Sequence, residues 1–188
     1  EDGIRDCLLS RGLGDVYKRQ DNKLRQKGEE INAFDDNLKK ISDDMLETMY
    51  AAKGIGLAAV QVNLPIRLIV IDISESRNEP IILVNPIIND RKEKIIFEEG
   101  CLSVPGFYEK VERYNDINVT YNDIDGNTIN KNVEGLLAVC IQHEIDHLDG
   151  KLFVDYISNL KRDRIAKKIK KTLASGSVPA RKDVPYNI

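Results

Sequence analysis

The sequence lacks the patterns that mark several classes of protein. No apolar run approaches the ~18 residues that a membrane-spanning helix needs, and three cysteines among 188 residues are too few and too scattered for a disulfide framework. The formal net charge of −3 provides no general attraction to nucleic acid. The first residues show no basic region followed by an apolar segment, the mark of a secretory signal. We therefore expect a protein of a reducing compartment.

The remaining composition is ordinary for a globular protein, with 41% apolar and 31% charged residues. Residues 1–20 show no sustained periodicity and resemble a translated sequencing adaptor, so we expect a non-native or disordered extension there. Residues 21–171 are expected to form one folded domain. Residues 172–188 have loop composition and are expected to form a flexible tail.

Apolar periodicity predicts three helices, at about 35–53, 134–148 and 157–171. Asp35 or Asp36 is the expected N-cap of the first helix, and Gly54 is its expected terminator. Short strands are predicted at 67–73, 81–84, 94–97, 111–113, 117–121 and 128–133, with Asp125-Gly126 as a hairpin turn. Strands in the middle of the chain and helices at both ends predict an α+β fold.

Residues 54–59 (GIGLAA) match the fingerprint of dinucleotide-binding proteins in sequence but not in context. That fingerprint follows a strand and opens a helix. Here it follows the first expected helix, and Pro65 and an expected strand come soon after it. A nucleotide site is therefore excluded, and the two glycines instead predict an unusual backbone or a close approach to a ligand.

The only two histidines of the chain, His143 and His147, stand four residues apart in one expected helix. This spacing places both imidazoles on one face, ~6 Å apart along the axis, so both can bind one metal ion. Glu144 directly follows the first histidine, where it could act on a metal-bound water. The alternative is an ordinary helix that happens to carry two histidines. The absence of histidine elsewhere favours a site.

A catalytic metal site of this kind needs a third protein ligand. Metallopeptidases supply a histidine six residues after the second one, where this chain has Phe153, or a downstream glutamate, and no Glu follows Glu144. Asp155 remains a candidate. The chain therefore lacks the usual third ligand of both familiar metallopeptidase arrangements.

The cysteines are better candidates for the third ligand. Cys140 shares the histidine face of the helix but lies ~10.5 Å from His147 along the axis, so we expect it to line the site as a small buried residue. Cys101 follows a strand-like run, among glycine and proline turn residues that could present a thiolate to a neighbouring helix. The alternative for a lone cysteine is core packing.

Three segments together resemble the signature motifs of peptide deformylases: 54–61 (GIGLAAVQ), 99–103 (EGCLS) and 142–147 (QHEIDH). Their order and spacing fit the family, and the resemblance covers about 21–171. The lack of long insertions resembles the bacterial form. Residues 21–25 (DNKLR) resemble the segment with which the family opens, although Gln20 replaces a proline and the expected first strand is absent.

The resemblance implies a hydrolase of the bacterial cytoplasm that removes the N-formyl group from the initiator N-formylmethionine of newly made proteins and releases formate. It implies mixed, mainly antiparallel sheets packed around the two-histidine helix, with a basic C-terminal helix. By carry-over, one divalent metal is bound by Cys101, His143 and His147. The metal is Fe(II) in most of the family, and Zn, Ni or Co also suit these donors.

The resemblance also implies catalytic and substrate roles. Glu144 acts as general base and then general acid, and the Gln61 amide and the Leu102 N–H stabilise the oxyanion. The peptide backbone binds Ile55, Gly56 and Gly100, the methionine side chain enters a pocket with Leu136, Val139 and Cys140, and Glu99 pairs with Arg113.

Two other functions remain open at this level: a metallopeptidase, and an inactive metal-binding homologue. The resemblance further suggests that the basic third helix contacts ribosomal RNA, and the alternative is a solvated charged face. Its cations are Lys161, Arg162, Arg164, Lys167, Lys168, Lys170 and Lys171.

Overall fold

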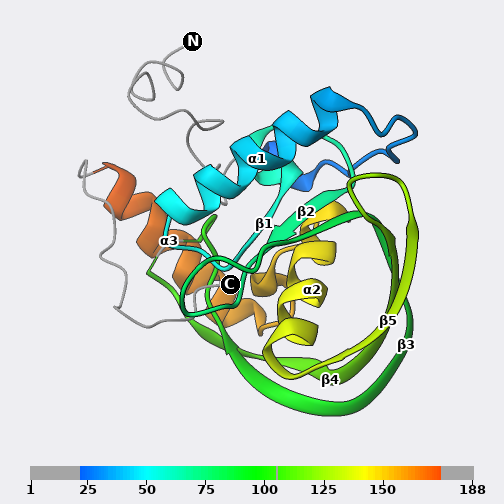
Figure 1. The fold of residues 1–188 in the computed structure, drawn as a ribbon. Helices are drawn as coiled ribbons and strands as arrows, with labels where there is room; N and C mark the ends of the chain where they lie inside the picture. The colour runs from blue at the N-terminus through cyan, green and yellow to red at the C-terminus, as the bar shows by residue number, and fades with distance from the viewer. Residues whose placement is uncertain (1–21, 105, 175–188) are drawn as a thin grey trace.

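A curved antiparallel sheet encloses the second helix in the computed structural model (Figure 1). Its five strands follow the chain order and are β1 (Gly56–Ala58), β2 (Leu68–Ile71), β3 (Ile81–Glu99), β4 (Glu109–Asn122) and β5 (Thr128–Glu134). The helices are α1 (Asp36–Ala51), α2 (Gly135–Leu148) and α3 (Asn159–Ala174), with 3-10 turns η2 (Asn22–Arg25), η3 (Ala59–Val62) and η4 (Phe153–Asp155). This α+β architecture agrees with the expected fold class.

The structure describes residues 22–104 and 106–174. The expected extension at 1–20 lies outside the described residues. Of the expected tail, 172–174 continue α3 three residues past its expected end, and the remainder lies outside the described residues. Within the described ranges, no helix has both the length and the apolar character needed to cross a bilayer.

Strands β3 and β4 are each longer than expected, because each joins two of the predicted short strands. The charged stretch between the predicted strands of β3 has no apolar alternation, yet it pairs with β4 through Asp90↔Asn118 and Lys92↔Asp116. Register shifts near the start of β3 and positive φ values at Asn85 and Glu93 interrupt its regular course. Bulges of this kind bend a strand and increase its twist. The long bent pair can therefore wrap around α2.

The first helix begins as its sequence predicts and ends slightly differently. Asp35 is the N-cap, and its carboxylate accepts a hydrogen bond from the Leu38 N–H at 2.9 Å. At the other end Lys53, with φ of 54°, adopts the left-handed conformation that was expected of Gly54. Leu38, Met45 and Met49 are buried against β1 and β2, so both methionines belong to the core.

Helix α2 is the centre of the molecule. Every residue from Ala138 to Leu148 is buried, as expected of a helix surrounded by other elements. After the helix, Gly150 has φ of 73°, and a Cβ there would lie 2.6 Å from the Arg25 carbonyl oxygen. The Gly28 N–H also donates to the Leu148 carbonyl at 2.8 Å. The N-terminal segment thus holds the end of the helix that carries the two histidines.

Candidate metal centre

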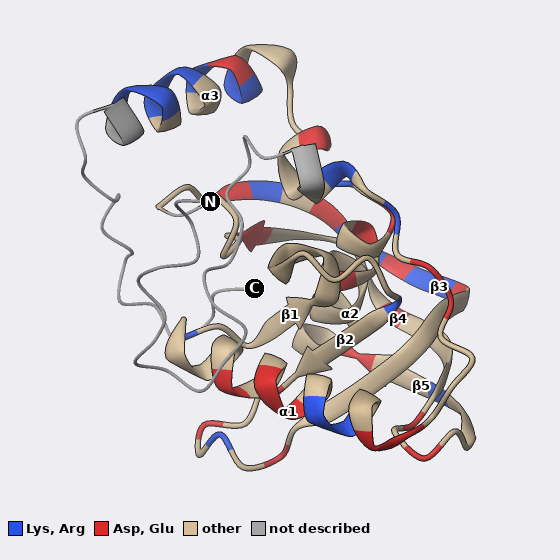
Figure 2. Ribbon diagram, turned by 90° about the horizontal axis from the view of Figure 1, so that it is seen from above, with Lys and Arg blue, Asp and Glu red and all other residues tan. Residues whose placement is uncertain are grey.

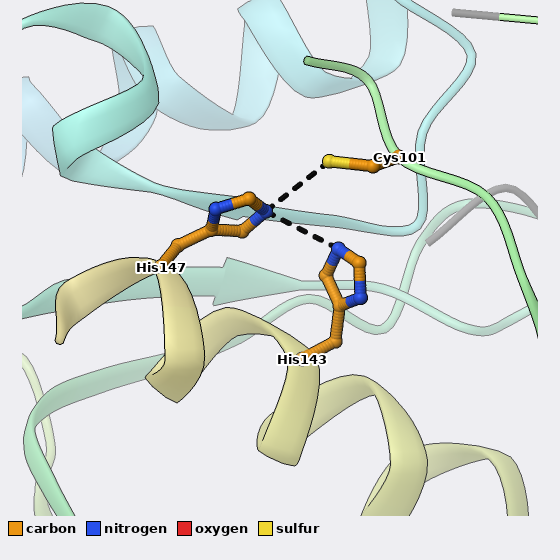
Figure 3. Close-up of side chains that lie close together, drawn as sticks. All are labelled: Cys101, His143 and His147. Atoms are coloured by element: carbon orange, nitrogen blue, oxygen red, sulfur yellow. Dashed lines mark hydrogen bonds between the residues drawn. The ribbon is translucent and has the colours of Figure 1, made fainter. Parts of the chain in front are cut away.

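Cys101, His143 and His147 come together in the interior, between the end of β3 and one face of α2 (Figure 3). His147 Nε2 lies 3.2 Å from Cys101 Sγ and 3.2 Å from His143 Nε2. All three donor atoms lie within 4.8 Å of one another, and all three residues are buried. Tetrahedral ligation with bonds of ~2.0–2.3 Å separates ligand atoms by roughly 3.3–3.6 Å. The cluster is therefore of the right size and chemistry for one metal ion.

The position of each donor follows from local structure. His143 and His147 are one helical turn apart on α2, which brings their side chains to the same face. Cys101 comes two residues after β3, where the chain turns and Val104 N–H bonds back to the Cys101 carbonyl at 3.0 Å. The cysteine turn packs under α3 through an apolar cluster that includes Val104, Phe153 and Ile165.

A buried network of charges supports His143. Its Nδ1 lies 2.9 Å from Glu99 Oε2, and Arg113 donates from Nε and Nη2 to the same carboxylate at 2.5 and 3.0 Å. Arg113 Nη1 donates to Asp146 Oδ2 at 2.6 Å, and Tyr156 donates to Asp146 Oδ1 at 2.8 Å. Burial raises the pKa of Glu99, but the bonds from His143 and Arg113 outweigh it and bring that pKa to about 2.

Glu144 is fully buried beside the donors and has no strong partner. Among the described residues neither of its carboxylate oxygens accepts a well-formed hydrogen bond. The nearby Ala58 N–H acts to lower the pKa of Glu144. Its hydrogen bond, however, is donated to Gln61 Oε1 at 2.8 Å. Burial raises the pKa of Glu144 to about 7. A carboxyl group with this pKa can both accept and donate a proton near neutral pH.

The glycine-rich segment packs directly against this carboxyl group. A Cβ on Gly56 would lie 2.6 Å from Glu144 Oε1 and 2.8 Å from Cys140 Sγ. Gly56 opens β1, an edge strand that was not predicted and that, among the described residues, pairs only with β2. The structure thus shows a close approach of β1 to α2 at Gly56, and the expected approach to a ligand stays a prediction.

Gln61 lies on η3 with its amide held in one orientation. Its Oε1 accepts from Ala58 N–H, so its Nε2 faces the cysteine turn, 3.1 Å from Ser103 Oγ and 3.8 Å from Cys101 Sγ. The Leu102 N–H lies next to Cys101 in the same turn and, within 22–104 and 106–174, donates no hydrogen bond. Both groups are hydrogen-bond donors close to the cluster of Cys101, His143 and His147.

The residues expected to contact substrate surround the cluster on several elements. Ile55 and Gly56 begin the β1 region, and Gly100 directly precedes Cys101. Leu136, Val139 and Cys140 lie on α2 one to two turns before His143 and also pack into the apolar core beneath the sheet.

Asp155 is not a metal ligand, and this corrects one of the candidates from the sequence. Its carboxylate pairs with Arg25 and accepts from the Leu152 N–H at 2.9 Å, which fixes η4. Sequence reasoning also missed Asp146, Tyr156 and Ser103 as supporting residues. Asp146 and Ser103 stand inside the quoted motifs, but only the fold shows which side chains they hold.

Comparisons with known proteins identify the family. The profile described as "Polypeptide deformylase" matches residues 14–163. A peptide deformylase of Nitrosococcus oceani is 55% identical over 151 residues, which cover 80% of this chain and 90% of that protein. One of Azotobacter vinelandii is 55% identical over 157 residues, 83% of this chain and 94% of that protein. The chain belongs to the polypeptide deformylase family.

Solved structures of the deformylase family share this fold. A peptide deformylase from Legionella pneumophila superposes with a TM-score of 0.82 at 43% identity, covering 86% of this chain and 96% of the other. One from Ehrlichia chaffeensis, in complex with actinonin, gives a TM-score of 0.80 at 41% identity over 84% and 96% of the two chains. As a deformylase the chain is an amide hydrolase that removes the N-formyl group from nascent peptides, which excludes the metallopeptidase alternative.

Neutralising Glu99 should weaken metal binding. In Glu99→Gln the neutral amide no longer raises the basicity of His143, and Arg113 loses its main counter-charge. Losing such a support of a histidine ligand typically costs roughly 10- to 100-fold in metal affinity. Competition with a chromogenic chelator for zinc measures the change. Glu98→Gln, at the exposed neighbouring position, should bind zinc as the parent does. If Glu99→Gln binds zinc as tightly as Glu98→Gln and the parent do, Glu99 does not support metal binding.

Proposed function

We propose that Cys101, His143 and His147 hold the single divalent metal ion of this deformylase, and that the ion is Fe(II). The proposal is supported by a buried donor set of one thiolate and two imidazoles within 4.8 Å of one another. Such a set suits first-row metals and offers no hard oxygen donor for Mg²⁺ or Ca²⁺. When bound, the metal supplies Lewis-acid chemistry, which makes a water molecule acidic near neutral pH and polarises the formyl carbonyl.

Glu144 moves the proton in this proposal. Its carboxylate accepts a proton from the attacking water and then delivers it to the amine that leaves when the C–N bond of the formamide breaks. The buried, weakly partnered position of Glu144 supports this role, because burial brings its pKa to about 7. A pKa near the working pH suits a group that must serve first as base and then as acid. The products are formate and a peptide with a free N-terminus.

Gln61 and Leu102 stabilise the negative charge that develops on the formyl oxygen. The Gln61 Nε2 group is directed toward the metal cluster because Ala58 holds the other end of the amide. The Leu102 N–H comes from the turn that carries Cys101, so both donors are fixed before substrate arrives. Fixed donors avoid reorganisation during the reaction, and each is typically worth ~3 kcal/mol of the barrier.

The peptide binds in an extended conformation beside β1. This strand is the edge of the sheet, and in the part of the chain that the structure describes no strand pairs with its other side, where the peptide would add as a further strand. The backbones of Ile55, Gly56 and Gly100 hold the peptide by main-chain hydrogen bonds, as in other cases of β-strand addition. The methionine side chain is directed to Leu136, Val139 and Cys140 on α2.

The single observation that carries the catalytic proposal is the fully buried Glu144 beside the three donors. Glu144→Gln keeps the size of the side chain and removes its proton-transfer capacity. Formate release from a formyl-Met-Ala-Ser peptide should fall by roughly 10²- to 10⁴-fold in kcat, with zinc affinity unchanged. Glu134→Gln, at the exposed N-cap of α2, is the matched control and should retain full activity. Activity retained in Glu144→Gln would rule out its catalytic role.

Metal content and sensitivity to oxygen test whether the bound ion is Fe(II). Protein purified from its bacterial host without oxygen should contain iron as its main metal by mass spectrometry. Aeration should then reduce its activity, because a thiolate and Fe(II) are both readily oxidised. Zinc as the main metal, or an iron-loaded enzyme that survives prolonged aeration unchanged, would contradict the proposal.

We also propose that the enzyme works in the bacterial cytoplasm and contacts the ribosome through α3. The bacterial origin of its curated relatives supports the compartment. Figure 2 shows Lys and Arg positions along α3, whereas α1 carries acidic as well as basic positions. Ile165 and Ile169 anchor α3 to the apolar cluster that includes the cysteine turn, and the basic residues of α3 other than the half-buried Arg162 are exposed. A basic helix held against a rigid body is suited to contact phosphates.

Neutralising part of the basic surface of α3 tests the ribosome contact without removing the helix. Deletion of α3 would expose the apolar cluster that includes Cys101. In co-sedimentation at low salt, the variant Lys167→Gln/Lys170→Gln/Lys171→Gln should bind ribosomes with ~10-fold lower affinity than the parent, because each lost cation removes a phosphate contact. A control with the same charge loss, Lys27→Gln/Lys40→Gln/Lys92→Gln, changes exposed lysines elsewhere and should bind as the parent does. An equal loss of ribosome affinity in both variants would show that only net charge matters, and it would contradict a contact through α3.

A further inference from the structure

A cavity lies against α2, apart from Cys101, His143 and His147. It has a volume of 440 Å³ and is lined by residues of β3, β4, α2 and the segments just before and after η4. Neither the three donors nor Glu144 is among its lining residues. Its volume falls in the range of small-molecule sites, ~300–1,000 Å³. The cavity is large enough to take a ligand of its own.

Each carboxylate that lines this cavity contacts a cation, and one of these cations, Arg113, also serves Glu99. Its three carboxylates each have a cation partner: Lys94 Nζ lies 2.7 Å from Glu112, Arg113 Nη1 lies 2.6 Å from Asp146, and Arg67 Nη1 lies 3.0 Å from Asp149. An anion that enters the cavity therefore meets paired carboxylates rather than free ones.

Two positive charges in the same cavity have no partner. Arg91 on β3 and Lys151 after α2 both line it. Across the described residues neither side chain makes an ion pair or a hydrogen bond. The cavity thus has two unpaired cations, supplied by positions 60 residues apart in the sequence. Both side chains are exposed, so their heads are available to a ligand from solvent.

The cavity wall also offers apolar surface. Ile88 and Ile145 line it, together with the ring of Tyr156. Tyr156 is held in place because its hydroxyl donates to Asp146 at 2.8 Å and its ring lies 4.9 Å from the Arg113 guanidinium. A ligand with a short carbon skeleton would contact these groups while its charged ends face the cations.

We propose that this cavity binds a small organic anion with two negative charges, carried by carboxylate or phosphate groups. Arg91 and Lys151 recognise the charges, and Tyr156 with the two isoleucines contacts the carbon skeleton. Arg113 and Asp146 form part of the wall and also support Glu99 and His143. An occupant would therefore touch the network that holds the metal centre, without contacting the metal donors.

Titration of the zinc-loaded full chain, followed by amide NMR shifts, tests the proposal. Succinate and inorganic phosphate are the probes, and sodium chloride at matched ionic strength is the third arm. Saturable shifts at Tyr114 and Lys151 are expected with succinate or phosphate, and the stronger of the two identifies the preferred charged group. Arg91→Gln/Lys151→Gln should weaken binding at least ~10-fold, with deformylase turnover unchanged in the absence of anion.

A control with equal charge loss is Lys92→Gln/Lys131→Gln, at exposed positions that do not line this cavity. It should bind the probes as the parent does. Three results would overturn the proposal: the same shifts with chloride, shifts confined to Leu102 and His147 at the metal centre, or unchanged affinity in Arg91→Gln/Lys151→Gln.

Discussion

The buried guanidinium of Arg113 joins the two elements from which the candidate metal centre is built. It binds Glu99 at the end of β3 and Asp146 on α2, and Glu99 in turn binds His143. A lone charge in the interior costs several kcal/mol, and removing one partner of a buried pair typically costs ~3–5 kcal/mol. The network is therefore stable only with all members present, and it sets the distance between the cysteine turn and the histidine helix.

This constraint explains why small residues surround the site. With β3 and α2 held together, β1 must pass close to the same helix, and at Gly56 there is no space for a Cβ beside Glu144 and Cys140. The edge strand, the proposed general base and the cysteine turn consequently lie within one compact region. Desolvation follows from the same packing, and it is the largest cause of the raised pKa of Glu144.

Much of the local structure could be predicted from the residues. The Asp35 cap, the three helices and the Asp125-Gly126 turn depend on interactions between near neighbours. The continuous strands β3 and β4 could not be predicted, because their charged middle sections are stabilised by pairing with each other and show no apolar alternation. Strand β1 was missed for a related reason: three residues carry no periodic signal, and only the partner strand β2 makes them a strand.

The sequence by itself determined the family, the helix that presents two histidines on one face, and the choice of Cys101 over Asp155 as the best third donor. Those conclusions rest on short spacings and on residue types, which survive without knowledge of the fold. The tertiary structure decided that Asp146, Tyr156 and Ser103 support the site, and that Arg91 and Lys151 share a cavity. These side chains meet across long sequence separations, and packing of the sheet around α2 alone brings them together.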